Sequence, residues 1–358
     1  MPAKIIGMIG VAPPQGTALH VIAGGISPSF LKEFAQAHEA ADFDYVLVGY
    51  YSSSADGFGV ASYAAANTKK LSFLIAHRPG NVTPTLAART SATFDALSGG
   101  RLALHIIAGI TDEDQQREGD FSPKSERYAR AAEYLDVMRR VWTSRTPFDY
   151  DGSFYKFRAA FSEARPVQQP YPPLFFGGSS PEALAMGAQH CDVFAMFGEP
   201  LAETAERITA FRKLAAPFGR QPRFNVSFRP IIAKTEGQAW DKAKQILAEL
   251  KSTGALPTKM QDKSAERLVA IAARGDVHDE RLWMPVAAAA AGKGNTSCLV
   301  GTPEQVAEAI LKYYRLGVAS FLIRGFDPLG DVADFGHELI PRIKAGALQI
   351  DQEMVAAA

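Results

Sequence analysis

Residues 71–109 read LSFLIAHRPGNVTPTLAARTSATFDALSGGRLALHIIAG, and this stretch decides the fold. It contains a short apolar run, a segment with helical spacing and then a second apolar run. Thr83 followed by Pro84 is typical of a helix N-cap with proline in the first turn, and the two glycines before Arg101 are typical of a helix end. The stretch is therefore predicted to form one strand–helix–strand unit.

The same pattern recurs along the whole chain. Eight short, nearly continuous apolar runs are each followed by a polar or glycine-rich break, as expected for parallel strands that are covered on both faces. Eight such units predict a (β/α)8 TIM barrel that forms one domain over residues 1–358. The predicted strands are Ile5–Val11, Tyr45–Tyr50, Leu71–His77, Leu102–Gly109, Pro173–Gly178, Asp192–Gly198, Phe224–Ile232 and Ser320–Phe326.

A doubly wound open sheet is the alternative fold. It usually carries a glycine-rich nucleotide turn after its first strand, and GVAPPQG at residues 10–16 matches that motif poorly. Two stretches are too long for simple connections and are predicted to be insertions, at about 110–123 after the fourth strand and about 252–302 between the seventh and eighth strands. We expect the second, with AAAAAGKGN at residues 287–295, to be partly mobile in the empty protein.

The composition argues against several classes of partner. The 358 residues include 38 basic and 38 acidic side chains and are 47% hydrophobic, which is typical of a soluble globular protein. This balance lacks the excess of basic residues that indicates binding to nucleic acid or to an acidic membrane. Cys191 and Cys298 match no metal spacing and are predicted to be buried, reduced thiols. A cytoplasmic location is expected, because the N-terminus lacks a signal-peptide layout and no apolar run reaches the roughly 18 residues of a membrane helix.

Three predicted strands carry an arginine where an active site would form. In a TIM barrel the residues at the C-terminal ends of the strands surround the active site, and Arg78, Arg229 and Arg324 belong to these regions. Fork-shaped guanidinium groups suit an anionic ligand. The alternative is that some of the arginines are paired for structural reasons with carboxylates such as Asp327 or Glu199.

Two histidines lie in the same regions. His77 and His105 are candidate acid–base groups, with a hydrogen-bonded structural role as the alternative. No cluster of His, Asp and Glu has the spacing of a metal site, so no catalytic metal is expected. Ser179 and Ser180 do not lie in a Gly-x-Ser-x-Gly elbow, which argues against a serine nucleophile.

The sequence Gly177-Gly178-Ser179-Ser180-Pro181 follows the fifth predicted strand. Glycines allow a close approach of the backbone, the serines offer hydroxyl groups, and proline fits the first turn of a helix whose N-terminus favours an anion. A phosphate is the expected ligand. The alternative is a helix capped by Ser179 or Ser180 alone.

Together with their neighbours, these residues resemble the bacterial luciferase-like flavin monooxygenases, and within them the alkanesulfonate monooxygenase group. The resemblance covers nearly the whole chain and implies a (β/α)8 barrel that uses reduced FMN and dioxygen. It also implies a separate NAD(P)H-dependent reductase that supplies the flavin, and a homodimer or homotetramer. The most specific blocks are LAARTSATFDALSGGRLALHIIAG (Leu86–Gly109), SERY (Ser125–Tyr128), PVQQPYPPLFFGGSSPEA (Pro166–Ala183), FGEP (Phe197–Pro200) and RFNVSFRPII (Arg223–Ile232).

The resemblance also implies roles for single residues. Tyr128, Ser179 and Ser180 match the contacts of the FMN phosphate, and His105 matches a position near the flavin ring. The full set of implied cofactor contacts is Gly178, Ser179, Ser180, Tyr128, His105 and Ala108.

On the substrate side the chain departs from the family pattern. Ser54 stands where a cysteine is typical, Phe197 replaces a tryptophan, and Phe326 replaces a tyrosine. Ser227-Phe228-Arg229 replaces an Arg-x-His pair, and Lys293 is the only cation near the position of the mobile-loop arginine. The implied catalytic residues are Arg229, His105 and Ser54, and the implied substrate contacts are Arg78, Arg229, Arg324, Phe197, Phe326 and Lys293.

The resemblance predicts a monooxygenase that cleaves the C–S bond of an organosulfonate to give sulfite and an aldehyde. The altered substrate side suits a bulkier or more hydroxylated sulfonate such as sulfoquinovose, as in a sulfoquinovose monooxygenase. The alternatives are oxidation of a sulfone or an amine, F420-dependent hydride transfer, or a flavin-binding protein without catalysis. A periplasmic sulfonate-binding protein is disfavoured by the missing signal peptide and the barrel-like strand order.

Overall fold

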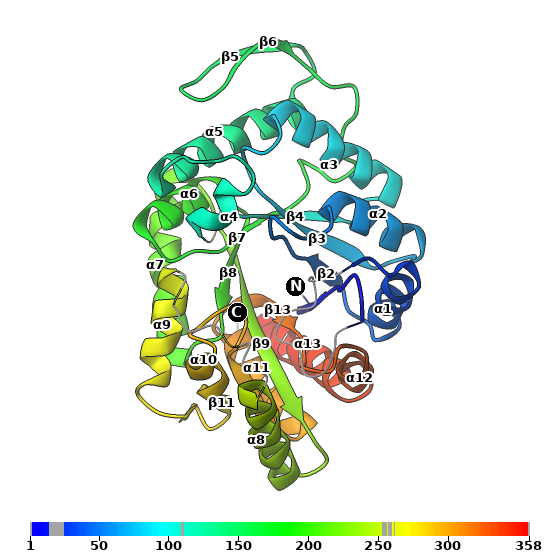
Figure 1. Cartoon of the computed structure of the whole chain (residues 1–358), viewed down its shortest axis with the longest axis vertical. Helices are drawn as coiled ribbons and strands as arrows, with labels where there is room; N and C mark the ends of the chain where they lie inside the picture. The colour runs from blue at the N-terminus through cyan, green and yellow to red at the C-terminus, as the bar shows by residue number, and fades with distance from the viewer. Residues whose placement is uncertain are drawn as a thin grey trace. The chain divides into compact units, whose positions relative to one another are not determined.

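The computed structural model describes residues 2–13, 25–108, 111–252, 256, 260 and 262–356 (Figure 1). The chain divides into two compact units. Unit 1 comprises Met1–Val46, Ala195–Ala210 and Arg223–Ala358, and unit 2 comprises Leu47–Phe194 and Phe211–Pro222.

Unit 2 is built on parallel strands. β3 pairs with β4, with Ile75 opposite Leu104, and β4 pairs with β7, with Ile106 opposite Phe176. β7 also pairs with β8. The strands are β2 (Tyr45–Val48), β3 (Ser72–His77), β4 (Leu102–Ile106), β7 (Leu174–Phe176) and β8 (Val193–Phe197), and the helices are α2 (Gly57–Ala66), α3 (Pro84–Ser98), α4 (Asp112–Gln116), α5 (Lys124–Thr143) and α6 (Pro181–His190).

The strand–helix–strand unit predicted at residues 71–109 is present as β3, α3 and β4. The Thr83 side chain caps α3 by accepting a hydrogen bond of 3.4 Å from the Leu86 amide. Gly99 ends the helix in the left-handed region at φ 72°, where a residue with a Cβ is strained. The predicted local signals therefore set both ends of this helix.

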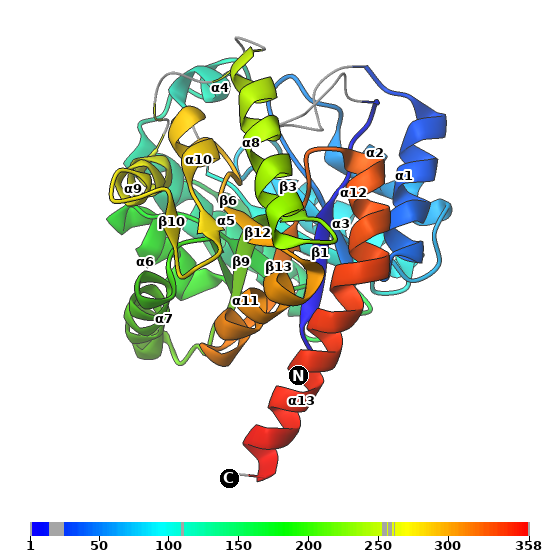
Figure 2. The ribbon, with the colours of Figure 1, turned by 90° about the horizontal axis from the view of Figure 1, so that it is seen from below.

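Unit 1 contains a second set of parallel strands, in the order β12-β9-β13-β1. Ile5 of β1 lies opposite Phe321 of β13, and Ile323 lies opposite Phe228 of β9. α8 and α11 pack against β12 (Figure 2). The strands are β1 (Lys4–Met8), β9 (Arg223–Ile232), β10 (Val277–His278), β11 (Leu282–Trp283), β12 (Cys298–Gly301) and β13 (Val318–Ile323), and the helices are α1 (Pro28–Ala40), α7 (Leu201–Ala215), α8 (Glu236–Ser252), α9 (Lys263–Ala272), α10 (Pro285–Ala289), α11 (Pro303–Arg315), α12 (Pro328–Asp334) and α13 (Ile340–Ala356).

Eight parallel strands alternate with helices along the chain, and this architecture is the (β/α)8 TIM barrel that the sequence predicts. β2, β8 and α7 each have residues in both units. Every predicted strand overlaps an observed one, although Gly109, the predicted end of the fourth strand, lies outside the described residues. The assignment of residues 1–358 to one domain stays a prediction. The eight strands are β1, β2, β3, β4, β7, β8, β9 and β13.

The two predicted insertions contain regular structure. The described part of the first, residues 111–123, contains α4, and residue 110 lies outside the described part. The second contains α9, β10, β11, α10 and β12, while residues 253–255, 257–259 and 261 are not described. β12 was not predicted, and it pairs in parallel with the second half of β9, with Cys298 opposite Arg229. The expected mobility of residues 287–295 stays a prediction.

A hairpin that the sequence did not predict is also present, in which β5 (Phe148–Asp151) pairs antiparallel with β6 (Lys156–Ala160) (Figure 1). Residues 14–16 of the GVAPPQG turn lie outside the described residues. No helix among the residues that the structure describes is both long and apolar enough to cross a lipid bilayer.

Candidate active site

The Gly-Gly-Ser-Ser loop connects β7 to α6 in unit 2. Ser180 caps α6, because its hydroxyl oxygen accepts a hydrogen bond of 3.3 Å from the Ala183 amide. A Cβ on Gly178 would lie 2.8 Å from the Ala183 Cβ and 3.1 Å from Cζ of Phe176, so packing of the loop requires glycine here. Ser180 therefore serves the helix itself, whereas Ser179 is not the capping residue.

Tyr128 lies beside the strand that leads into this loop. It belongs to α5, its side chain is buried, and its ring meets the Phe176 ring edge to face at a centroid distance of 6.3 Å. Phe176 is two residues before Gly178. The structure thus brings Tyr128 close to the Gly-Gly-Ser-Ser loop, although the two are some 50 residues apart in the sequence.

His105 lies on β4, opposite Ala76 of β3 and Phe175 of β7. Burial lowers the pKa of its imidazole to about 4, so the ring is neutral at pH 7. Its Nδ1 atom is buried and has no hydrogen-bond partner among the described residues. A buried polar atom of this kind calls for an explanation, and a polar ligand group is one. Ala108, three residues on, is buried, and its carbonyl oxygen accepts a hydrogen bond of 3.4 Å from Gln115 Nε2.

His77, the other histidine candidate, has a structural partner. Its Nε2 lies 2.9 Å from the Tyr134 hydroxyl, and burial lowers its pKa to about 4. This geometry favours the alternative of a hydrogen-bonded structural histidine.

Arg78 follows β3 and is held by two carboxylates. Its guanidinium forms ion pairs with Asp114 and Glu118, and it stacks 4.6 Å from the centroid of the Tyr50 ring. The side chain is 2% exposed. Two negative charges already surround this arginine, which favours a structural role over substrate binding.

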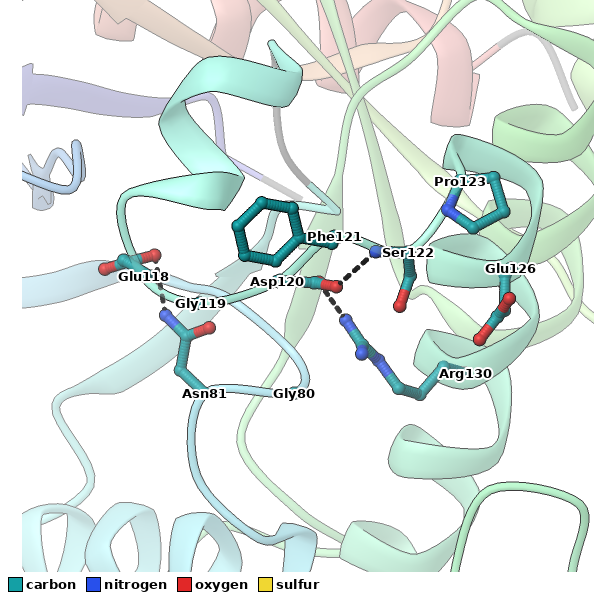
Figure 3. A pocket seen from close by; sticks show the side chains of 10 residues that line it. All are labelled: Gly80, Asn81, Glu118, Gly119, Asp120, Phe121, Ser122, Pro123, Glu126 and Arg130. Carbon is teal, nitrogen blue, oxygen red and sulfur yellow. Dashed lines mark hydrogen bonds and ion pairs between the residues drawn. The ribbon is translucent and has the colours of Figure 1, made fainter.

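The loop between α4 and α5 is held by further polar contacts, one of which is made by Glu118 (Figure 3). Asn81 Nδ2 donates to Glu118 at 2.8 Å, and Arg130 forms an ion pair with Asp120. Together with the exposed Phe121, these residues line a cavity of about 540 Å³. The acidic residues of this insertion were missed by the sequence analysis; the run DEDQQREGD at residues 112–120 was the available signal.

The Ser54 hydroxyl bonds to its own turn. It donates to the Tyr51 carbonyl oxygen at 2.9 Å and accepts from the Tyr51 amide at 3.1 Å. Its neighbour Ser52 donates to Asp114 at 2.6 Å. The described contacts of Ser54 are those of a loop residue, and its catalytic role stays a prediction.

Arg229 is the most deeply buried candidate, with 0% exposure, and belongs to unit 1. Its Nε donates to the Asn295 carbonyl oxygen at 2.7 Å and its Nη1 donates to the Gly325 carbonyl oxygen at 2.8 Å. The guanidinium also lies 4.4 Å from the centroid of the Phe326 ring. A Cβ on Gly325 would overlap the Asp331 carboxylate, so glycine is needed to present this carbonyl. The strand ends therefore orient the guanidinium rigidly.

Arg324 directly follows β13, the strand that pairs with β9, and lies beside Arg229. Because Ile323 pairs with Phe228, the two arginines come next to each other at the end of this pairing. Burial and then the charge of Arg324 lower the pKa of Arg229 well below its usual value. Arg324 Nη1 also lies 3.1 Å from the Met8 sulfur. Two adjacent guanidinium groups repel each other, and an anion bound beside them would relieve that repulsion.

The structure places the remaining candidates separately. Phe326 is buried against Arg229, whereas Phe197, at the end of β8, is partly exposed. Lys293 is partly exposed in the turn after α10, where its amide donates to the Ala290 carbonyl oxygen at 3.0 Å. The structure thus groups Arg229, Arg324 and Phe326, and the substrate roles of Phe197 and Lys293 stay predictions.

The carboxylates named as alternative partners for the arginines have other roles. Glu199 forms ion pairs with Arg207 and Arg267, and Asp327 caps α12. Within the described residues, no group of three or more His, Cys, Asp or Glu side chains is arranged to hold a metal ion.

Comparison with known proteins identifies the class. The chain matches the luciferase-like monooxygenase family over residues 8–320, and it belongs to this family. An EDTA monooxygenase from Chelativorans sp. BNC1 superposes with a TM-score of 0.77 at 14% identity, over 96% of this chain and 94% of that one.

Two further solved structures share the fold. A riboflavin lyase, solved with modified FMN and riboflavin, gives a TM-score of 0.75 at 21% identity over 96% of this chain and 92% of that one. An F420-dependent secondary alcohol dehydrogenase gives 0.68 at 18% identity over 96% and 99% of the respective chains. At these identities the likeness concerns the barrel fold alone.

Proposed function

We propose that the protein is a two-component monooxygenase that uses reduced FMN and O2 to cleave the C–S bond of an organosulfonate, releasing sulfite and an aldehyde. The observation that carries this proposal is the buried Arg229 with Arg324 beside it. A sulfonate is a permanent anion whose three oxygens accept charge-assisted hydrogen bonds from guanidinium groups. A sulfo-sugar such as sulfoquinovose is the narrower expectation.

The described residues of unit 2 fit the phosphate end and the ring of FMN. Backbone amides at the start of α6, the Ser179 and Ser180 hydroxyls and the Tyr128 hydroxyl would hold the phosphate, which the positive end of a helix dipole favours. The buried, unpartnered Nδ1 of His105 would bond a polar edge of the ring, with Ala108 as a further contact. When bound, reduced FMN supplies the two electrons with which one atom of O2 enters the aldehyde and the other leaves as water.

On the substrate side, the chain supplies charge and exclusion of water. Arg229 would bind the sulfonate from a water-free position, where its hydrogen bonds are stronger than in water. Arg324 would neutralise the remaining charge, and Phe326 and Phe197 would line the apolar part of the substrate. We expect Arg78 to support the loop after β3 and not to touch the substrate.

The test is sulfite release by the purified protein with FMN, a generic NAD(P)H-dependent flavin reductase, O2 and a panel of sulfonates. We expect sulfite from at least one sulfonate, with more from sulfoquinovose than from octanesulfonate. Omitting the reductase should abolish the product. Absence of sulfite from the whole panel would refute the proposed reaction.

An F420-dependent hydride transfer is the second candidate, because an F420-dependent alcohol dehydrogenase shares the barrel. Titration of the protein with oxidised FMN and with F420 separates the two candidates. Binding of F420 alone would favour hydride transfer.

A cytoplasmic location belongs to the proposed monooxygenase function, because the reductase must deliver reduced FMN by diffusion. The proposed assembly is a homodimer or homotetramer.

A further inference from the structure

Two consecutive residues before β12 carry buried side-chain oxygen atoms that bond to no group in the described part of the chain. Asn295 and Thr296 are 5% and 1% exposed. Neither Asn295 Oδ1 nor Thr296 Oγ1 has a hydrogen-bond partner within the ranges that the structure describes. Buried polar atoms are normally bonded, because desolvation without a partner costs free energy. Two such atoms on adjacent residues point to a ligand.

Asn295 is bonded to Arg229, and Thr296 is the next residue toward β12. The Asn295 carbonyl oxygen accepts a hydrogen bond of 2.7 Å from Arg229 Nε, and Asn295 Nδ2 donates to the Phe228 carbonyl oxygen at 3.0 Å. A carbonyl oxygen can only accept, so the orientation of the Asn295 amide is fixed and Oδ1 is the unused end. The next residue, Ser297, donates to the Gly198 carbonyl oxygen at 2.6 Å. The segment is therefore held firmly beside the guanidinium.

We propose that Asn295 Oδ1 and Thr296 Oγ1 bind hydroxyl groups of the anion that Arg229 holds, so that the substrate is a sulfonate with hydroxyl groups close to its charge. This inference rests on the proposed function. Asn295 Oδ1 can only accept, so its partner must be a hydrogen-bond donor, whereas the threonine hydroxyl both donates and accepts. A polyhydroxylated sulfonate provides such groups, and a plain alkanesulfonate provides none.

The pair would act as a specificity filter. A site built to bond a hydroxyl group discriminates strongly against the analogue that lacks it, because the buried polar atoms are then left without partners. Extra methylene groups in an apolar pocket discriminate much less. Asn295 and Thr296 would therefore separate hydroxylated from plain sulfonates even though Arg229 binds the charge of both.

The test compares 2,3-dihydroxypropane-1-sulfonate with propane-1-sulfonate by calorimetric titration of the FMN-saturated protein. We expect the wild-type protein to bind the dihydroxylated ligand at least about 10-fold more tightly. Thr296→Val has nearly the same shape but no hydroxyl, and we expect it to reduce this ratio to about 3-fold or less. Thr296→Ser should restore the ratio. Thr209→Val is the matched control, since the Thr209 hydroxyl bonds to Ala205 on the exposed face of α7.

Thermal unfolding distinguishes a binding role from a structural one. Because Thr296 Oγ1 makes no bond within the described residues, Thr296→Val should leave the melting temperature unchanged or raise it. A lowered melting temperature with an unchanged ligand ratio would show that the hydroxyl serves the fold, and would overturn the inference.

Sulfite release separates the remaining outcomes. If both sulfonates are cleaved with equal kcat/KM, the proposed function stands and the hydroxyl preference is wrong. If neither is bound and no sulfonate of the panel yields sulfite, the proposed function fails, and this inference fails with it.

Discussion

Arg78 directly follows β3 and Arg229 lies within β9; both are buried, but the charges around them differ. Arg78 forms ion pairs with Asp114 and Glu118, so the chain itself more than balances its charge. Arg229 donates to two backbone carbonyl oxygens and lies against the Phe326 ring, with a second arginine beside it. Burial alone therefore does not identify the arginine that binds a ligand.

The charge of the groups that contact a buried arginine is more informative than its burial. A buried ion pair is satisfied without a ligand, and removing one partner leaves an uncompensated charge. Arg229 donates to neutral carbonyl groups and lies within the field of both Arg324 and the Asp331 carboxylate, and an anionic ligand would add a further stabilising charge. This difference predicts that substitutions at the two arginines affect different quantities, with Arg229 acting on substrate binding and Arg78 on stability.

The largest expected effect is that of Arg229→Ala on catalysis. Loss of a buried charge-assisted contact should lower kcat/KM for a sulfonate by about 100-fold or more, because such contacts are worth several kcal/mol. FMN affinity should change much less. Sulfite release and FMN fluorescence titration measure the two effects, and Arg229→Lys, which keeps the charge, should lose less activity. An equal loss of substrate and FMN binding would assign Arg229 to the fold or to the flavin.

Arg78→Met should act on stability. It leaves Asp114 and Glu118 as neighbouring, unpaired carboxylates, and we expect the free energy of unfolding to fall by about 3 kcal/mol. Urea denaturation measures this, and KM for the sulfonate should stay close to the wild-type value. A large increase in KM with unchanged stability would place Arg78 in the substrate site and remove its contrast with Arg229.

Acid should weaken the wild-type protein more than it weakens Arg78→Met. Burial alone would raise the pKa of Asp114, but hydrogen bonds from Ser52 and Arg78 outweigh it and hold the pKa below the usual value. A depressed carboxyl pKa adds stability that is complete above the unfolded pKa of about 4 and is lost as pH falls further. Between pH 5 and 3, the difference in unfolding free energy between wild type and Arg78→Met should shrink by about 1 kcal/mol.

The buried histidines act at higher pH and provide the control. Burial lowers the pKa values of His77 and His105 to about 4, so their contribution is complete above about pH 6.5 and is lost as pH falls toward 4. This loss should be the same in wild type and Arg78→Met. If the change in unfolding free energy between pH 6.5 and pH 5 differed between the two proteins, the Asp114 explanation would be wrong.

The fold was predictable where the signals were local. Continuous apolar runs and helix starts such as Thr83-Pro84 revealed the eight barrel strands and several helices. β12 was missed because its four residues become a strand only by pairing with the second half of β9, a contact between distant parts of the chain. The hairpin of β5 and β6 was missed because its strands are polar and mostly exposed.

The sequence predicted which residue types form the candidate site, but it did not predict which groups these residues contact. The sequence indicated that Arg78, Arg229 and Arg324 belong to strand ends, yet it ranked them equally. Their difference depends on Asp114 and Glu118, which lie about 40 residues from Arg78 in an insertion with no motif. Asn295 and Thr296 were missed for the same reason, since only the folded chain shows that their side-chain oxygens are buried and have no hydrogen-bond partner among the described residues.

The smallest expected effect concerns Ser180 and Ser179, where one substitution should act mainly on stability and the other mainly on FMN binding. Ser180 caps α6, so Ser180→Ala should cost about 1 kcal/mol of stability. Ser179 does not cap the helix, so Ser179→Ala should cost less stability and weaken FMN binding several-fold through loss of a hydrogen bond to the phosphate. Urea denaturation and FMN titration of both variants provide the comparison. If Ser180→Ala weakened FMN binding more than Ser179→Ala did while the stability of the two variants stayed equal, the Ser180 hydroxyl would be the main phosphate contact and its role as the cap of α6 would be minor.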